Sequence, residues 1–143
     1  MAEGKVAVCT GSGRPGGLGE AILSRLGEEG YRLVVTDVDG SGSSHLAKPD
    51  EMEAVVARLS SQGAEVLSHT CDVRSPESVE QLFNVVMARF GRVDVLINNA
   101  GYGLYGAMED TSLEDARYQF EVNLFGLARL TQLVLPHMRK QNF

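Results

Sequence analysis

The stretch Thr10–Gly19, with the sequence TGSGRPGGLG, joins an apolar segment at residues 5–10 to a helical pattern that begins near Glu20. Glycines at such a junction permit a tight turn, let the backbone approach a diphosphate and direct the N–H groups of the helix start at an anion. Gly11, Gly13 and Gly16 match the spacing G-x-G-x-x-G of dinucleotide-binding turns. An ordinary flexible turn is the alternative, but the place of this run at the first strand-to-helix junction favours phosphate binding.

A carboxylate follows at the distance that such turns require. The next apolar run ends in Val34-Val35-Thr36-Asp37, roughly 20 residues further on. A carboxylate at this place accepts both hydroxyls of the adenosine ribose and repels a 2′-phosphate. Asp37 therefore favours NAD over NADP, although Arg14 in the glycine turn would suit a 2′-phosphate. Asp39 is interpreted as a solvated turn residue.

Four apolar, β-rich runs recur about every 30 residues, the size of a βα repeat. They are Lys5–Thr10, Arg32–Asp37, Glu65–Cys71 and Val93–Asn98, each followed by a longer stretch of helical periodicity. Nearly continuous apolar strands are typical of a parallel sheet covered on both faces. The sequence predicts an α/β fold, a Rossmann-type doubly wound sheet with strand order 3-2-1-4 and two helices on each face. Residues 1–143 are expected to form one dinucleotide-binding domain that stops before a fifth strand.

Composition limits the partners of this domain. The chain has 43% apolar and 22% charged residues and a formal net charge of −6, with ten arginines and three lysines scattered along it. We therefore expect no nucleic-acid partner. No apolar run approaches membrane-spanning length and the first strand begins close to Met1, so we expect no membrane association and a cytoplasmic location. Cys9 and Cys71 are expected to be core thiols, and the histidines show no metal-ligand spacing.

Capping residues mark several helix boundaries. Ser75 followed by proline predicts a helix start, and Gly91 its end; Ser112 opens the last helix in the same way. The turn-rich segment between Gly40 and Pro49 is expected to be a surface loop.

Three further motifs accompany the glycine turn in a fixed order. They are Cys71–Val73 (CDV), Asn98–Gly101 (NNAG) and Val122–Gly126 (VNLFG). Together with the turn they resemble the classical short-chain dehydrogenases/reductases, over essentially the whole chain but only the amino-terminal portion of that family's domain. The resemblance implies hydride transfer between a nicotinamide cofactor and a small alcohol or carbonyl substrate.

The resemblance also assigns site residues. Asp72 and Val73 would border the adenine, the NNAG segment would line the cofactor's ribose, and Asn123 would be the catalytic asparagine that helps hold a water in a proton relay. The expected cofactor-binding residues are Gly11, Ser12, Gly13, Arg14, Gly17, Leu18, Gly19, Asp37, Asp72, Val73, Asn99, Ala100 and Gly101. In the alternative reading Asp72 caps a turn, the asparagines of NNAG satisfy backbone groups, and Asn123 is a tolerated helix residue.

Two departures from the family pattern matter. Five residues separate Thr-Gly from Gly-x-Gly where the family usually has three, which leaves open which glycine contacts phosphate. The family's serine and Tyr-x-x-x-Lys pair, which orient the carbonyl and supply the acid/base, are absent. Acid/base help is worth about 10²–10⁴-fold in rate, so we expect no appreciable turnover by this chain alone. Tyr102 and Tyr105 either line a substrate pocket or, as we favour, pack in their loop.

The last helix is too apolar for one solvated face. Its apolar residues are Phe120, Leu124, Leu127, Leu130, Leu133, Val134 and Leu135. We expect a homo-oligomer formed through this helix, with burial under further chain as the alternative. Two other functions stay open: a non-catalytic dinucleotide-binding sensor or interaction module, and a methyltransferase, which also uses a glycine turn.

Overall fold

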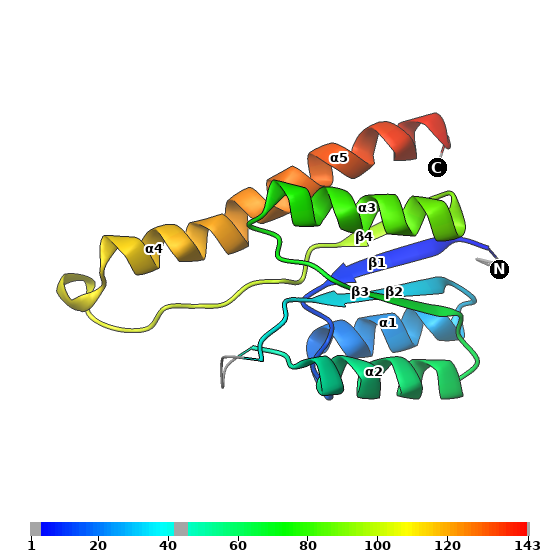
Figure 1. The fold of residues 1–143 in the computed structure, drawn as a ribbon, viewed down its shortest axis with the longest axis horizontal. Helices are drawn as coiled ribbons and strands as arrows, with labels where there is room; N and C mark the ends of the chain where they lie inside the picture. Colours follow the sequence, from blue (N-terminus) through cyan, green and yellow to red (C-terminus); the bar gives the residue numbers. More distant parts are fainter. Residues whose placement is uncertain (1–3, 42–45, 143) are drawn as a thin grey trace.

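A four-stranded parallel sheet organises the chain (Figure 1). The computed structural model describes residues 4–41 and 46–142. The strands are β1 (Val6–Thr10), β2 (Arg32–Asp37), β3 (Val66–Thr70) and β4 (Val95–Ile97), in the order β3-β2-β1-β4. The predicted strand order and α/β class are confirmed. β4 is shorter than predicted, by two residues at its start and one at its end; at the end, Asn99 N–H turns back to the carbonyl of Ile97, 3.0 Å away, and the pairing with β1 stops.

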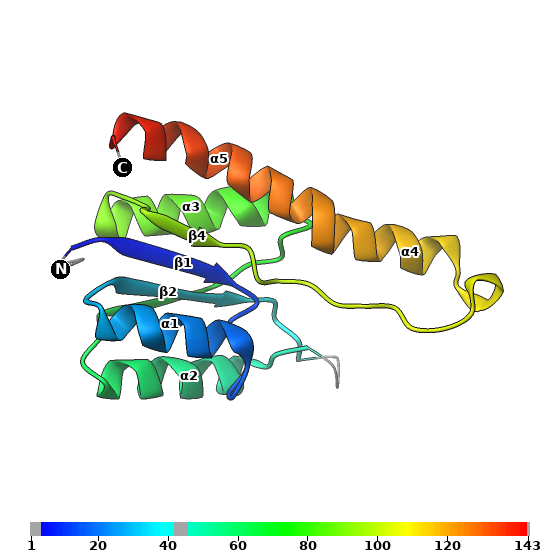
Figure 2. The ribbon, with the colours of Figure 1, turned by 180° about the vertical axis from the view of Figure 1, so that it is seen from behind.

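Helices cover both faces of the sheet (Figures 1 and 2), as predicted. One face carries α1 (Leu18–Glu28) and α2 (Pro49–Ser61); the other carries α3 (Pro76–Phe90) and α5 (Leu127–Lys140). A short 3₁₀ turn η1 (Met108–Asp110), α4 (Leu113–Phe120) and a π-helical turn η2 (Glu121–Gly126) precede α5. No helix within residues 4–41 and 46–142 has the length and apolar character needed to cross a bilayer.

Alternate residues of the central strands feed two separate cores. Val6 and Val8 of β1 point to the α3/α5 side, and Ala7 and Cys9 to the α1/α2 side. All of β1 is buried, which explains its unbroken apolar sequence. Cys9 and Cys71 are free, buried thiols as predicted, and burial raises the pKa of Cys9 to about 12.

The predicted caps are present. Ser75 Oγ accepts a hydrogen bond from Ser78 N–H at the start of α3, and Gly91 ends that helix in the left-handed region at φ 72°. Ser112 Oγ accepts from Asp115 N–H at the start of α4. The loop expected between Gly40 and Pro49 lies partly outside the described residues, at 42–45.

The last helix differs from the single element that was predicted. α4, η2 and α5 form one rod that projects past the sheet at its α4 end (Figure 2), with one π turn inside it. α5 buries Leu130 and Val134 against α3 and the sheet. Along the whole rod, large apolar side chains remain exposed, as the sequence indicated: Leu113, Phe120, Leu124, Phe125, Leu127 and Leu135.

Candidate functional site

Three of the motifs and Asp37 meet where the parallel strands end. The glycine turn follows β1, Asp37 closes β2, Asp72 follows β3 and Asn99 follows β4. On one side of β1 the chain passes to β2 through α1 over one face of the sheet, and on the other side β4 is reached from β3 through α3 over the opposite face. Ligands of doubly wound sheets bind at such a switch point. The fold therefore brings the predicted site residues to one edge of the sheet.

The enlarged glycine turn uses several of its own amides internally. Gly13 N–H donates to Asp37 Oδ2 at 2.9 Å, Gly16 N–H to Glu20 Oε2 at 2.6 Å, and Gly17 N–H to the carbonyl of Arg14 at 3.1 Å. These bonds fix the conformation of the two extra residues. They also answer in part which glycine remains open to an anion, because these three amides already have acceptors.

The start of α1 keeps open amides. Gly17 is its N-cap and makes no side-chain capping bond, and the first helical bond of this turn runs from Ala21 N–H to the Gly17 carbonyl. Leu18 and Gly19 therefore have N–H groups without an intrahelical acceptor, at the positive end of the helix dipole. This donor set fits a diphosphate.

Gly19 and Gly11 are required by close packing. A Cβ on Gly19 would lie 2.8 Å from Cα and Cβ of Ser12 and 2.9 Å from Asn99 Nδ2. A Cβ on Gly11, which has φ 63°, would lie 2.8 Å from Cα of Ala100. These glycines let the turn, α1 and the segment after β4 approach one another.

The side chain of Ser12 stabilises the base of the glycine turn. The residue is 1% exposed, and its hydroxyl donates to the carbonyl of Cys9 at 2.7 Å and accepts from Thr36 N–H at 3.2 Å. The hydroxyl thus joins the ends of β1 and β2, and the backbone N–H of Ser12 donates to the carbonyl of Thr36 at 3.1 Å, so both donors of Ser12 already have acceptors.

Asp37 both holds the turn and remains an acceptor. Its Oδ2 accepts from Gly13 and its Oδ1 accepts from Val38 N–H at 2.9 Å. A carboxylate oxygen has two lone pairs, so each oxygen keeps one for a further donor such as a hydroxyl. Asp39 is an exposed turn residue as expected, and the hydrogen bonds from the side chain and backbone of Ser41 lower its pKa.

The NNAG segment is tied to β1 by Thr10 and Asn99. Thr10 Oγ1 accepts from Asn99 N–H at 3.2 Å and from Ala100 N–H at 3.0 Å. Asn99 Nδ2 donates to the carbonyls of Thr10 and Gly11 at 3.0 and 2.9 Å, and Asn98 Nδ2 donates to Thr131 Oγ1 of α5 at 3.1 Å. Asn99 thus satisfies backbone groups, the role given above as the alternative, whereas Asn98 donates to a side-chain hydroxyl.

Asn123 lies in the π turn η2, a distortion that often marks functional positions. Its Nδ2 donates to the carbonyl of Tyr102 at 2.7 Å, and its Oδ1 accepts from Tyr102 N–H at 3.0 Å. The side chain therefore positions the backbone that follows β4. Tyr102 packs edge to face against Tyr118, whereas Tyr105 is 97% exposed, so the expectation of loop packing is wrong for Tyr105.

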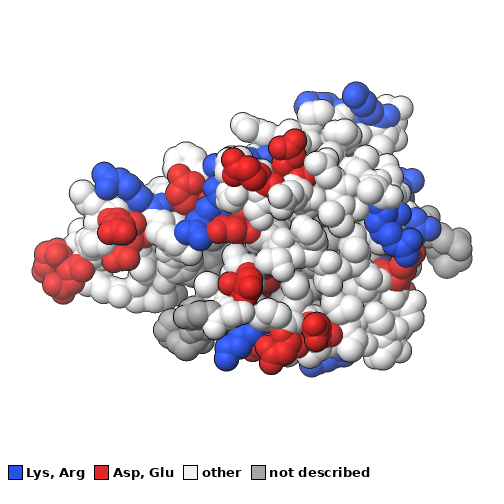
Figure 3. All heavy atoms as spheres, viewed as in Figure 1, with Lys and Arg blue, Asp and Glu red and all other residues white. Residues whose placement is uncertain are grey.

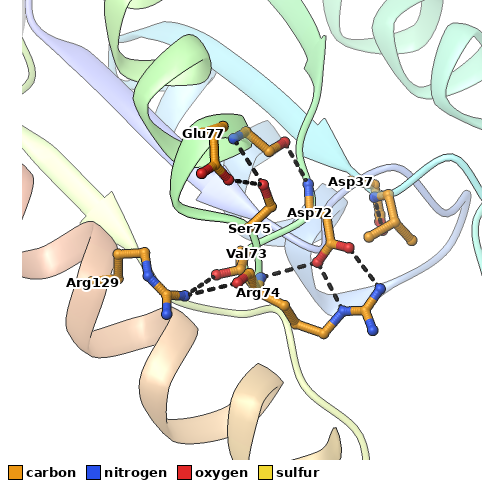
Figure 4. Close-up of polar contacts among 9 residues, drawn as sticks. Asp37, Asp72, Val73, Arg74, Ser75, Glu77 and Arg129 are labelled. Atoms are coloured by element: carbon orange, nitrogen blue, oxygen red, sulfur yellow. Dashed lines mark hydrogen bonds and ion pairs between the residues drawn. The ribbon is translucent and has the colours of Figure 1, made fainter.

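Asp72 forms a fork with Arg74 that sequence reasoning missed (Figure 4). Arg74 Nε donates to Oδ1 at 3.0 Å, Nη2 donates to Oδ2 at 2.6 Å, and the backbone N–H of Arg74 donates to Oδ1 at 2.9 Å. Burial alone would raise the pKa of Asp72, but the hydrogen bonds and charge of Arg74 outweigh it and lower the pKa.

Arg129 and Glu20 also stabilise the site, although neither belongs to a motif that the sequence analysis identified. Arg129 of α5 donates to the carbonyls of Val73 and Arg74 at 2.9 and 3.2 Å (Figure 4). Glu20 is 5% exposed, and its carboxylate lies 3.1 Å from the guanidinium of Arg58 in α2. These ion pairs and hydrogen bonds hold α5 and α2 against the turn segments.

The surface shows no single basic patch on the face in Figure 3, where lysine and arginine are interspersed with aspartate and glutamate. Among residues 4–41 and 46–142, no three histidine, cysteine, aspartate or glutamate side chains are grouped to hold a metal ion.

Known proteins share this arrangement. The family model of the short chain dehydrogenases matches residues 5–143. The chain is 31% identical to the 7alpha-hydroxysteroid dehydrogenase of Escherichia coli and 36% identical to the L-fucose dehydrogenase of Bos taurus, each over 96% of this chain and 49% and 46% of those proteins. It spans about half the length of the curated relatives it matches.

Solved structures agree. An NAD⁺-bound xylitol dehydrogenase superposes with a TM-score of 0.86 at 32% identity, covering 99% of this chain and 50% of that one. A metagenomic short-chain oxidoreductase in complex with NADP gives a TM-score of 0.85 at 32% identity, covering 97% and 58%. The chain therefore belongs to the short-chain dehydrogenase family, of which it carries the NAD(P)-binding region.

Proposed function

We propose that this chain binds NAD with its diphosphate on the amides of Leu18 and Gly19. The observation that carries this proposal is the uncapped start of α1 in a turn whose neighbouring amides at Gly13, Gly16 and Gly17 already have acceptors. Packing at Gly19 holds the helix start in place. The site is thus prearranged for a bound anion.

Asp37 supports NAD over NADP. Its carboxylate stands at the end of β2 with one lone pair open on each oxygen, and the ribose hydroxyls are donors that suit them. A 2′-phosphate would meet the same negative charge at short range. Relatives with bound NAD⁺ and with bound NADP are both known, so the carboxylate of this chain is the basis of the choice.

The other assigned residues complete the proposed site. Asp72 and Val73 border the adenine, and Asn99, Ala100 and Gly101 line the cofactor's ribose. The cofactor would accept or donate the hydride. Asn123 would act at the reacting end through the backbone that its side chain positions.

In the whole family enzyme the substrate would be a small alcohol or carbonyl compound. The 143 residues contain no Tyr-x-x-x-Lys pair. We propose that this chain alone binds cofactor without appreciable hydride transfer. The free thiols Cys9 and Cys71 suit a reducing compartment, and we propose the cytoplasm.

We also propose self-association through the α4–η2–α5 rod. A groove of about 410 Å³ runs along α4, and its lining residues are Leu113, Ala116, Arg117, Phe120, Glu121 and Phe125. Phe120 is 56% exposed and Leu113 is 71% exposed. Clustered exposed apolar side chains of this kind mark association surfaces.

Calorimetric titration with NAD and NADP tests the cofactor assignment. Wild type is expected to bind NAD more tightly, and Asp37→Ala to lose about tenfold in NAD affinity, the worth of a hydrogen bond to a charged group. Asp39→Ala removes the same charge from an exposed turn and is the matched control. Unchanged NAD affinity in Asp37→Ala, or tighter binding of NADP by wild type, would contradict the assignment.

A further inference from the structure

The guanidinium of Arg74 lies between a carboxylate and an aromatic ring. It forms the two-bond fork with Asp72 on one side, and its Cζ lies 4.2 Å from the centre of the Tyr118 ring of α4 on the other. A planar guanidinium suits both partners at once, through parallel hydrogen bonds and through stacking on the ring. Arg74 thus joins the segment after β3 to α4.

Other residues hold both Arg74 and Tyr118 in place. The carbonyl of Arg74 accepts from Arg129 of α5 at 3.2 Å, and the ring of Tyr118 packs edge to face on Tyr102 at 5.8 Å. A Cβ on Gly126 would lie 2.8 Å from Val73 Cγ2, so the rod approaches this segment closely. The orientation of the Asp72 carboxylate is therefore set by α4 and α5 as well as by its own loop.

The Asp72 carboxylate can still accept a hydrogen bond from outside the chain. Oδ1 accepts two N–H groups of Arg74 and Oδ2 accepts one, and the Asp72 side chain is 33% exposed. One lone pair of Oδ2 is left for an external donor. An ionised carboxylate only accepts hydrogen bonds, so this position suits the amino group of a 6-aminopurine and repels the carbonyl of a 6-oxopurine.

We propose that Arg74 is a positioning residue that aligns Asp72 so that the site selects a 6-aminopurine over a 6-oxopurine at that end of the dinucleotide. The inference rests on the proposed function, which puts the adenine at Asp72 and Val73. Without the fork, the carboxylate rotates and is hydrated, and the selection is lost. Tyr118 contributes because its ring fixes the plane of the guanidinium.

Calorimetric titration with NAD and with nicotinamide hypoxanthine dinucleotide measures this selection. Wild type is expected to bind NAD about tenfold more tightly than the hypoxanthine analogue. Arg74→Met is expected to bring the two affinities within about twofold, by weakening NAD binding while the analogue is little affected. Tyr118→Leu is expected to give an intermediate ratio, and Arg139→Met, which removes an exposed cation from the far end of α5, to keep the wild-type ratio.

The outcomes separate the proposals. A tenfold preference retained by Arg74→Met, an equal loss of both ligands in that variant, or a changed ratio in Arg139→Met overturns the positioning role. If circular dichroism shows that Arg74→Met does not fold, an unchanged ratio in folded Tyr118→Leu overturns it. Wild type that binds neither dinucleotide refutes the proposed function itself, whereas wild type that binds NAD through Asp37 without preferring it to the analogue refutes only this inference.

Discussion

Thr10→Val removes one hydroxyl from the junction between β1 and the NNAG segment and keeps the size of the side chain. Thr10 is 2% exposed, and its hydroxyl accepts from the backbone N–H groups of Asn99 and Ala100. Asn99 N–H also donates to the carbonyl of Ile97 at 3.0 Å and keeps that partner in the variant. The substitution therefore leaves one N–H, that of Ala100, without its acceptor.

The cost follows from that single group. Leaving a buried donor unpaired costs about 1–3 kcal/mol, and the partial burial of Ala100 favours the middle of this range. We expect Thr10→Val to lower the free energy of unfolding by about 2 kcal/mol. With a urea slope of about 2 kcal/mol/M, the unfolding midpoint would fall by about 1 M.

Urea unfolding followed by far-ultraviolet circular dichroism measures this change. Thr10→Ser keeps the hydroxyl and is the matched control, with an expected loss below about 1 kcal/mol. If Val is as stable as wild type, or if Ser loses as much as Val, the hydroxyl does not hold the segment and the reasoning fails.

Three further predictions follow from the same contacts. Gly19→Ala is expected to weaken NAD binding at least tenfold, because the added Cβ would collide with Ser12. In the control Gly16→Ala no atom lies within 4 Å of the added Cβ, so the only cost is the backbone strain of φ 72°, about 1–2 kcal/mol. Equal NAD affinities of the two variants by calorimetry would refute the packing role of Gly19. Asp94→Ala breaks a buried carboxylate's bonds to Arg92 and a strand amide and is expected to cost about 3 kcal/mol at neutral pH. Burial favours a raised pKa of Asp94, but its hydrogen bonds and neighbouring cations lower the pKa. The stability that Asp94 contributes is therefore present above the unfolded pKa of about 4 and is lost as pH falls through the folded pKa. A difference in unfolding free energy between wild type and Asp94→Ala that does not shrink in acid would contradict this. Phe120→Glu is expected to shift sedimentation toward monomer, and a monomeric wild type across a wide concentration range would refute self-association.

The strand order and the layers could be predicted because they follow from the βα repeat of about 30 residues and from the apolar character of the strands. β1 is apolar on nearly every residue, β2 has an apolar and buried centre at Leu33–Val35, and the helix after β3 carries readable caps at Ser75 and Gly91. The π turn at Glu121–Gly126 had no such signal: its residues, Glu-Val-Asn-Leu-Phe-Gly, mix good and poor helix formers, and no sequence pattern separates it from the helices on either side. Its position depends on the contacts of Asn123 with the loop after β4.

The site could be located from motifs, but its hydrogen bonds could not. The spacing of the glycines does not tell which of their N–H groups are free to bind phosphate. Only the folded turn shows that the N–H groups of Gly13 and Gly16 donate to the carboxylates of Asp37 and Glu20. Arg74 was missed because the sequence does not show that its side chain turns back to Asp72, and the ring of Tyr118 that fixes this orientation is distant in sequence and brought near by packing of the rod. Long-range side-chain pairs of this kind carry no local pattern.

Amide NMR during titration with NAD tests the central claim most directly. In ¹H–¹⁵N spectra of the uniformly labelled protein, the amide signals of Leu18 and Gly19 are predicted to shift the most, together with those near Asp37, while Gly63 at the opposite end of α2 stays unchanged. Saturable shifts that spare Leu18 and Gly19 and appear elsewhere would contradict the account.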